Sequence, residues 1–141
     1  TYGKVAGSNP KDALYYGYQT TLSGVMEKYI PGDYEFDVPK KLIDLYNKKD
    51  YGMYANKNGE VPVNFTATNH TTGGNSGSPA LDANGNLIGL NFDRQWEGTM
   101  SDINFDPRFS RNIMVDSKYI LFIIDKYADA KWLINEMKIV K

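Results

Sequence analysis

The sequence lacks cysteine, has almost no net charge and contains no long hydrophobic run. Its 16 basic and 17 acidic residues leave a formal net charge of -1, so the protein has no field that would attract nucleic acid or an anionic membrane. No apolar run reaches the length of a membrane span, and residues 1–7 lack the regions of a signal peptide. The absence of cysteine excludes disulfides but marks no compartment, because exported bacterial proteins often lack them.

The length of 141 residues suits one domain with its own core. No stretch is long or polar enough to act as a linker, and no internal repeat or low-complexity segment is present. We therefore expect a single domain over residues 1–141.

The most informative stretch, residues 68–81, reads T-N-H-T-T-G-G-N-S-G-S-P-A-L. Glycines on both sides of Ser76 leave few side chains around its hydroxyl, which suits a nucleophile. They also let the amides of Gly74 and Ser76 lie side by side, as an oxyanion hole requires. On the pattern alone an ordinary surface turn remains an alternative. No lysine follows the glycines, which excludes a phosphate-binding loop of the Walker type.

Several short stretches predict strands. In residues 61–68 every second residue is apolar, the pattern of a half-buried strand. Asn84-Gly85 predicts a tight hairpin, and the return strand over residues 87–94 passes close to Ser76. Further strands are expected at residues 2–6, 112–115 and, as one or two, within 11–29, with a turn at residues 7–10.

Helices are expected between and after these strands. A helix is expected to begin with Asp37 as its cap and Pro39 in its first turn, and to stop near Gly52. A nearly all-apolar helix begins near residue 117 and is followed, after a break, by a last amphipathic helix. Short strands in series with helices added at the end predict a mainly β protein built on a small antiparallel β-barrel.

Several separate segments carry a family resemblance. The serine loop is similar to that of chymotrypsin-fold serine peptidases. Residues 87–103, L-I-G-L-N-F-D-R-Q-W-E-G-T-M-S-D-I, add a second piece, with Y-G-K-V at the start, D-V-P-K-K-L at 37–42 and M-V-D-S-K-Y-I-L-F-I-I-D-K-Y at 114–127. Over almost its whole length the chain resembles the bacterial exopeptidase family that includes dipeptidyl peptidases 7 and 11.

This resemblance implies a fold and a place within it. The family is similar to chymotrypsin in having two β-barrels, with a helical insertion over the cleft, and it removes dipeptides from free peptide N-termini. The chain corresponds to the C-terminal, six-stranded barrel. The upstream barrel and the helical insertion would then belong to a longer polypeptide of which this chain is a fragment.

The resemblance also implies residue roles. Ser76 matches the nucleophile, and Gly74 and Ser76 supply the oxyanion amides. Arg94 matches the position that selects Asp or Glu, because a guanidinium offers a substrate carboxylate two charge-assisted hydrogen bonds. Asp93 matches the anchor for the α-ammonium of the substrate, and Phe92 lines the same site. In an ideal strand Asp93 and Arg94 point to opposite faces.

A surface ion pair is the alternative reading of Arg94. Without the resemblance, Arg94 would simply pair with Asp102 or Asp106.

The general base is missing from the sequence. A serine nucleophile needs a base, usually histidine, that is itself oriented by a carboxylate. The single histidine, His70, is only six residues before Ser76, whereas the resemblance places the histidine and aspartate well upstream. We therefore interpret His70 as a loop or pocket-wall residue and expect the isolated chain to have little or no activity.

The resemblance extends to the whole enzyme. It implies a serine dipeptidyl peptidase that cleaves after Asp or Glu, needs no metal or cofactor, forms a homodimer and is found in the periplasm or at the cell surface of a Gram-negative bacterium. Two alternatives share the serine loop: an endopeptidase specific for Glu, and a non-catalytic barrel that binds peptides.

Overall fold

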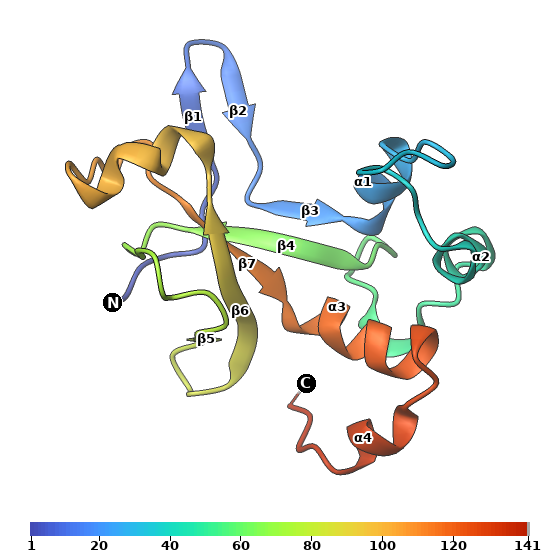
Figure 1. The fold of residues 1–141 in the computed structure, drawn as a ribbon. Helices are drawn as coiled ribbons and strands as arrows, with labels where there is room; N and C mark the ends of the chain where they lie inside the picture. The colour runs from blue at the N-terminus through green and yellow to red at the C-terminus, as the bar shows by residue number, and fades with distance from the viewer. Residues whose placement is uncertain (141) are drawn as a thin grey trace. The chain divides into compact units, whose positions relative to one another are not determined.

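The computed structural model describes residues 1–140, which form two compact units. Unit 1 comprises residues 1–20 and 64–117, and unit 2 comprises residues 21–63 and, of the residues described, 118–140. The main elements are, in chain order, strands β1 (Ser8–Lys11), β2 (Leu14–Tyr16) and β3 (Gln19–Thr21), helices α1 (Leu22–Glu27) and α2 (Lys40–Lys48), strands β4 (Pro62–Ala67), β5 (Pro79–Leu81), β6 (Leu87–Arg94) and β7 (Asn112–Asp116), and helices α3 (Ser117–Phe122) and α4 (Lys131–Asn135) (Figure 1). None of the helices within residues 1–140 is long and apolar enough to cross a bilayer.

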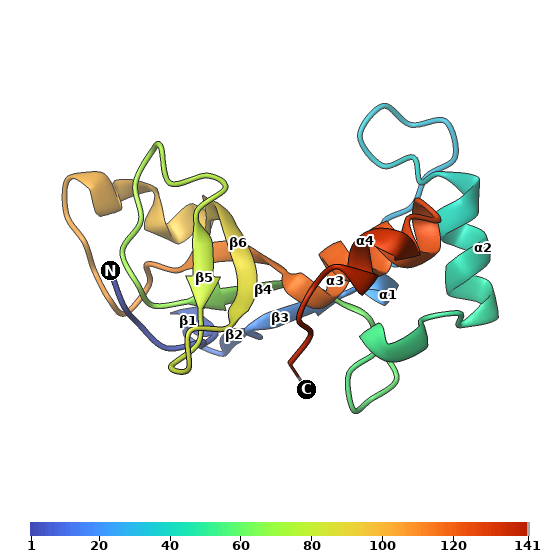
Figure 2. The same cartoon turned by 90° about the horizontal axis from the view of Figure 1, so that it is seen from below.

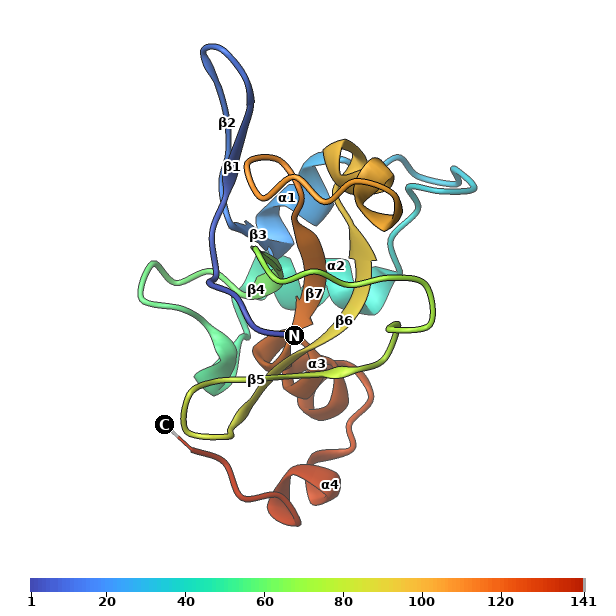
Figure 3. The same ribbon diagram turned by 90° about the vertical axis from the view of Figure 1, so that its left-hand side faces the viewer.

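The strands form two sheets. One is the β1-β2 pair, and the other has five strands in the order β3-β4-β7-β6-β5. The pairs β4·β7, β6·β7 and β5·β6 are antiparallel. Figure 2 shows β5 and β6 side by side, with the loop that carries Ser76 leading into β5, and Figure 3 shows β6 beside β7. Unit 1 therefore presents the serine loop next to the strand that the sequence predicted as its neighbour.

Unit 1 has a small apolar core. Phe65, Ala67 and Met114 are buried there, and Phe65 lies opposite Met114 in the β4·β7 register. Gly89 of β6 packs against this core so closely that a Cβ atom would lie 2.5 Å from the Val115 carbonyl oxygen. The buried apolar core of unit 1 thus consists of few side chains.

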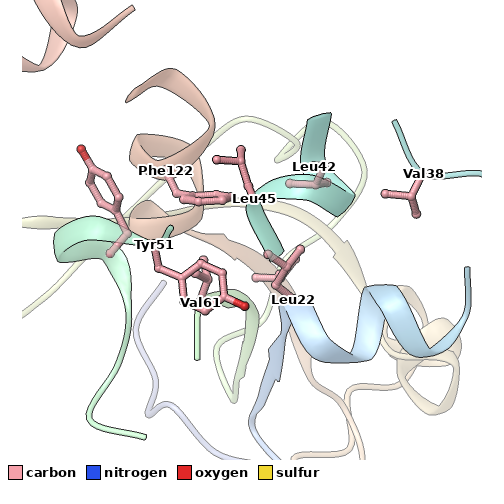
Figure 4. Close-up of a cluster of buried hydrophobic side chains, with 9 residues drawn as sticks. Leu22, Val38, Leu42, Leu45, Tyr51, Val61 and Phe122 are labelled. Carbon is pink, nitrogen blue, oxygen red and sulfur yellow. The ribbon is translucent and has the colours of Figure 1, made fainter. Parts of the chain in front are cut away.

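Unit 2 has a larger core that is built mainly from helices. Phe122 is fully buried at its centre, and its ring meets those of Tyr51 and Tyr54 edge-on, with centroids 6.2 and 6.4 Å apart. Figure 4 shows these side chains converging from several elements. The buried members of this core are Leu22, Val38, Leu42, Leu45, Tyr51, Tyr54, Val61, Val63 and Phe122.

Helix α2 begins at Lys40, two residues later than a cap at Asp37 predicts. Asp37 was expected to cap it, but its Oδ1 accepts the N–H of the next residue, Val38, at 3.0 Å. Pro39 occupies the cap position, and no side chain there accepts a helix amide. At the other end, Lys49 adopts a left-handed conformation with φ 53° and donates to the Leu45 carbonyl. That residue ends the helix before Gly52, where the sequence predicted the end.

The N-terminal predictions were partly wrong. Residues 2–6 form no strand and contribute one isolated bridge, from Val5 to Ala67. The predicted turn at 7–10 instead opens β1, because the backbone of Ser8 pairs with that of Tyr16. Residues 22–27 fold as α1 although their predicted state was strand, since burial of Leu22 in the unit 2 core outweighs local preference.

The closed, six-stranded barrel is not observed. The structure is mainly β with added helices, as predicted, but its strands divide into a two-stranded and a five-stranded sheet. The order β3-β4-β7-β6-β5 places β3 and β5 at opposite edges. Part of the predicted strand content is helical in α1, which leaves too few strands in the larger sheet.

The remaining elements agree with the sequence. Strand β6 has the predicted bounds, and the hairpin before it turns at Gly85, with φ 83°. The expected helix after β7 is α3, which continues as a π-helical segment, Ile123–Tyr127. The chain then breaks at Asp129, with φ 55°, before the short helix α4, where Ile134 is buried.

Candidate active site

Ser76 lies at the exposed tip of a tight turn. Gly74 and Gly77, on either side of it, have φ of 91° and 86°, a left-handed conformation that side chains rarely adopt. The turn closes on itself, because the Asn75 amide donates to the Thr72 carbonyl at 3.2 Å and the Thr72 amide donates to Asn75 Oδ1 at 2.9 Å. The Ser76 hydroxyl is therefore exposed on a tight turn whose backbone conformation depends on the neighbouring glycines.

Some backbone amides of this turn form hydrogen bonds within the protein and others do not. Those of Asn75 and Gly77 are engaged, the second as donor to the Asn91 carbonyl at 2.7 Å. Within residues 1–140, the amides of Gly74 and Ser76 donate to no protein acceptor. These two are the donors that the sequence proposed for an oxyanion.

The serine loop is tied to β6. Ser76 Oγ donates to the Phe92 carbonyl at 3.2 Å, which confirms that this strand passes close to Ser76. Arg94 lies two residues further along β6, which corresponds to about 7 Å along an extended strand. Ser76 and the strand end that carries Arg94 are thus neighbours in unit 1.

Asn91 fixes the loop to the strand, and sequence reasoning missed it. The residue is 6% exposed, and its amide group donates to the Asn75 carbonyl at 3.2 Å while accepting from Asn112 Nδ2 at 3.0 Å. Its backbone N–H also donates to the Ser78 carbonyl at 2.9 Å. The available signal was a lone polar side chain within the apolar run 87–92.

A β-bulge changes the direction of side chains at the end of β6. Asn91 lies opposite Met114 and Asp93 opposite Ile113, so Phe92 is an extra residue in this strand. A bulge of this kind bends the strand and redirects its side chains. Asp93 and Arg94, which follow the bulge at the end of the strand, both line one open hollow of about 540 Å³, together with Trp96, Thr99 and Asp102.

Asp93 is exposed and only partly engaged. Its Oδ1 accepts the backbone N–H of Arg94 at 2.8 Å. Among residues 1–140, no group donates to its Oδ2. One carboxylate oxygen is thus fixed to the strand, and the other is available to a cation in the hollow.

Arg94 forms the ion pair that the sequence offered as an alternative. Its Nη1 and Nη2 donate to the two carboxylate oxygens of Asp102, at 3.0 and 2.9 Å, and Nη1 also donates to Ser101 Oγ at 2.9 Å. These hydrogen bonds lower the pKa of Asp102, so the carboxylate stays ionised in mild acid. Arg94 nevertheless borders the hollow beside Asp93, so the pairing and a substrate contact are compatible.

His70 is not a partner of Ser76. Its exposed ring lies 4.8 Å from that of Phe105, centroid to centroid. Within the described chain, Ser76 Oγ has one hydrogen-bond partner, the Phe92 carbonyl. His70 borders a small cavity of about 10 Å³ that Arg94 also lines, which agrees with its interpretation as a wall residue.

The described residues carry no evident metal centre. No group of three or more potential His, Asp or Glu ligands is brought together within residues 1–140. The chemistry that the arrangement can support is an exposed hydroxyl beside two free amides, next to a strand end that offers one carboxylate and one guanidinium.

A model of the peptidase S46 family matches residues 1–139. The chain belongs to this family. Two relatives are named Asp/Glu-specific dipeptidyl-peptidase. The protein from Flavobacterium psychrophilum is 73% identical over 140 residues, and that from Capnocytophaga gingivalis is 70% identical over 141 residues. The match covers 99% and 100% of this chain, and 20% of each relative. The chain therefore spans about a fifth of the length of these relatives.

Similarity extends to the other named branch and to solved structures. Dipeptidyl-peptidase 7 of Phocaeicola vulgatus is 55% identical over 141 residues, covering 100% of this chain and 20% of that protein. The crystal structure of Porphyromonas endodontalis DPP11 in complex with dipeptide Arg-Glu matches 95% of this chain and 19% of its own, with 54% identity and a TM-score of 0.93. The predicted membership in the family of dipeptidyl peptidases 7 and 11 is confirmed.

Proposed function

We propose that this chain is the nucleophile-bearing part of a serine dipeptidyl peptidase that releases N-terminal dipeptides ending in Asp or Glu. The observation that carries the proposal is the hydrogen bond from Ser76 Oγ to the Phe92 carbonyl, because it places the hydroxyl beside the strand end where Asp93 and Arg94 line one hollow. Relatives of 73% and 70% identity that are named Asp/Glu-specific dipeptidyl-peptidase support the substrate class.

The chemistry assigns each group a task. Ser76 Oγ attacks the carbonyl carbon after the second residue of the peptide, and the amides of Gly74 and Ser76 hold the oxyanion that forms. The base that takes the Ser76 proton, and its carboxylate partner, come from a region upstream of this chain. No metal or cofactor enters these steps.

The strand end measures and selects the substrate. Arg94 receives the side-chain carboxylate of Asp or Glu through charge-assisted hydrogen bonds. Asp93 Oδ2 receives the α-ammonium, which restricts cleavage to the second residue from a free N-terminus. Phe92, which is exposed beside Ser76, contacts the peptide between these two anchors.

The surroundings follow from the same proposal. In the whole protein the five-stranded sheet belongs to the C-terminal barrel of a chymotrypsin-like pair, residues 1–141 forming one domain of it. The whole enzyme is a homodimer in the periplasm or at the surface of a Gram-negative bacterium. The resemblance of the serine loop and of residues 87–103 to dipeptidyl peptidases supports these statements.

Arg94→Gly in the full-length protein tests the substrate class. With a chromogenic dipeptide substrate ending in Asp, kcat/KM is expected to fall about a hundredfold or more, because a charged partner of the substrate is lost. Preference should shift towards substrates ending in apolar residues. The matched control is Arg108→Gly, which removes an exposed arginine paired with Asp106 in the same unit. Unchanged preference for Asp in Arg94→Gly would refute the assigned role.

Two further assays separate the alternative functions. Cleavage of N-terminally blocked peptides after Glu at a rate similar to that of free peptides would favour an endopeptidase. Failure of a fluorophosphonate to label Ser76 in the full-length protein would favour a non-catalytic, peptide-binding barrel.

A further inference from the structure

Arg94 is held by one end of its guanidinium only. Both N–H groups of Nη1 are engaged, one with Ser101 Oγ at 2.9 Å and one with Asp102 Oδ1 at 3.0 Å. One N–H of Nη2 donates to Asp102 Oδ2 at 2.9 Å. The carboxylate of Asp102 thus binds the Nη1/Nη2 end of the guanidinium.

The other edge of the guanidinium has no protein partner. Nε–H and the second N–H of Nη2 lie parallel on this edge, and within residues 1–140 neither donates to any acceptor. A guanidinium binds a carboxylate through two parallel N–H groups. The edge that remains therefore has the geometry for a second carboxylate.

Both members of the pair border the hollow. The Arg94 side chain is 20% exposed, and the Asp102 side chain 51%. Both line the hollow of about 540 Å³ that Asp93 also borders. The side chain of Ser101, in contrast, belongs to a residue that is only 6% exposed, so it holds Arg94 from the protein side.

We propose that Asp102, assisted by Ser101, is the positioning residue that turns the free Nε/Nη2 edge of Arg94 towards the acidic side chain of the substrate. The inference rests on the proposed function, because it assigns Arg94 the substrate carboxylate. A free arginine side chain loses rotamer entropy when it is fixed. Asp102 fixes the Arg94 side chain before the substrate arrives. The cost is that Asp102 places a negative charge near the substrate carboxylate.

The test is Asp102→Asn in the full-length enzyme. Asn keeps the size of the side chain but replaces one acceptor oxygen by a donor NH₂, so the two-point grip on Arg94 is lost. We expect kcat/KM for a dipeptide substrate ending in Asp to fall about tenfold to hundredfold, mainly through KM. For a substrate ending in an apolar residue the change should be less than about twofold. Ser101→Ala should act in the same direction and more weakly.

A double-mutant cycle separates positioning from a general structural effect. In an Arg94→Gly background, Asp102→Asn should not lower the ratio of Asp to apolar cleavage, since nothing remains to be positioned. The matched control is Asp106→Asn, which breaks the Arg108 ion pair of the same unit and should leave this ratio as in the wild type.

The outcomes distinguish the inference from the proposed function. If Arg94→Gly abolishes the preference for Asp while Asp102→Asn leaves it intact, the positioning role is wrong and the proposed function stands. A rise in the preference on Asp102→Asn would mean that Asp102 competes with the substrate, which also overturns the inference. If Arg94→Gly itself has no effect, the proposed substrate class fails, and the inference with it.

Discussion

Unit 1 buries more polar side chains than apolar ones, whereas the buried cluster of unit 2 is aliphatic and aromatic. In unit 2 the central cluster consists of aliphatic residues, tyrosines and Phe122. In unit 1 the apolar cluster is limited to Phe65, Ala67 and Met114, with two partly buried neighbours. All the buried polar or charged residues that the structure describes lie in unit 1, namely Ser8, Thr66, Asn91, Ser101, Ser110, Arg111 and Asn112.

The buried polar groups of unit 1 hold loops in one geometry. Arg111 donates from Nε to the Gly7 carbonyl at 2.9 Å and from Nη1 to the Pro107 carbonyl at 2.9 Å, and burial lowers its pKa. Asn91 likewise joins the serine loop to β6. Each such hydrogen bond adds about 1 kcal/mol of net stability but specifies a direction. An apolar contact adds stability without specifying one.

This difference explains where the candidate site lies. Ser76, Asp93 and Arg94 all belong to unit 1, whose loops are fixed by directed bonds. The difference predicts how substitutions act. At exposed positions of unit 1 they should change activity more than stability, and in the unit 2 core they should change stability more than activity. Four substitutions test this prediction, each in the full-length protein.

Ser76→Ala should have the largest effect. Removal of a serine nucleophile lowers kcat about 10⁴- to 10⁶-fold. Because Ser76 is exposed and its hydroxyl makes one hydrogen bond, the free energy of unfolding should change by less than about 0.5 kcal/mol. Steady-state kinetics and thermal unfolding measure the two quantities. The matched control is Ser78→Ala, two residues along the same loop, which should retain activity. Substantial turnover by Ser76→Ala would rule out its role as nucleophile.

Phe122→Ala should reverse the pattern in unit 2. Phe122 is fully buried and meets two tyrosine rings edge-on, so truncation should lower the free energy of unfolding by about 3–5 kcal/mol. Denaturant unfolding measures the loss, and kcat/KM per folded molecule should stay near that of the wild type. Trp132→Ala is the control in the same unit, because its side chain is 62% exposed and its removal should have little effect. A stability loss below about 1 kcal/mol for Phe122→Ala would show that the unit 2 core does not act as described.

The sequence predicted best where its signals were local. Alternation over residues 61–68 identified β4, and the Asn84-Gly85 turn identified the hairpin that leads into β6. The contact between Ser76 and β6 followed from that hairpin, because a tight turn brings its two arms together. These patterns depend on residues close in sequence and need no knowledge of the rest of the fold.

The predictions failed where distant residues decide the structure. Helix α1 contains residues that favour strands, yet Leu22 is drawn into the unit 2 core and the segment folds as a helix. Strand β1 exists because Ser8 finds a partner in Tyr16. A propensity of a few tenths of a kcal/mol per residue is smaller than the free energy of burying one large apolar side chain.

Several residues of the candidate site were proposed from the sequence. Ser76 was proposed from its glycine-rich loop and Asp93 and Arg94 from the family resemblance, and Asp102 was one of two partners considered for Arg94. The bulge at Phe92 was not predictable, because it depends on the register between β6 and β7.

Asn91→Ala should sharpen the comparison, because it affects both quantities. The substitution removes the hydrogen bonds to the Asn75 carbonyl and from Asn112 Nδ2, and leaves the Asn112 amide buried without that partner. A stability loss of about 1–3 kcal/mol is expected. Activity should fall about tenfold, since the serine loop loses one tie to β6. Unfolding and kcat measure the two effects, and Asn86→Ala, in the exposed hairpin, serves as the control for kcat. A stability loss with unchanged kcat would show that Asn91 does not position the loop.

Tyr54→Phe should have the smallest effect, and it should remove a pH dependence of stability from unit 2. Burial, with the hydrogen bond donated to Asp125 Oδ2 at 2.8 Å, raises the pKa of Tyr54 from 10.0 to about 12. The neutral phenol is thus favoured in the folded state. Its contribution to stability is complete below pH 10 and is lost as the pH rises towards 12.

Unfolding midpoints measured at several pH values test this contribution. At neutral pH, Tyr54→Phe should lower the free energy of unfolding by about 1 kcal/mol, because one buried hydrogen bond is lost. Above pH 10 the variant should lose less stability than the wild type, since the group that titrates in the core is absent. Tyr34→Phe is the matched control, because Tyr34 is 99% exposed, and it should titrate like the wild type. Parallel pH profiles for Tyr54→Phe and the wild type would mean that the unit 2 core owes nothing to this directed bond, and the contrast between the units would then be stronger than the structure indicates.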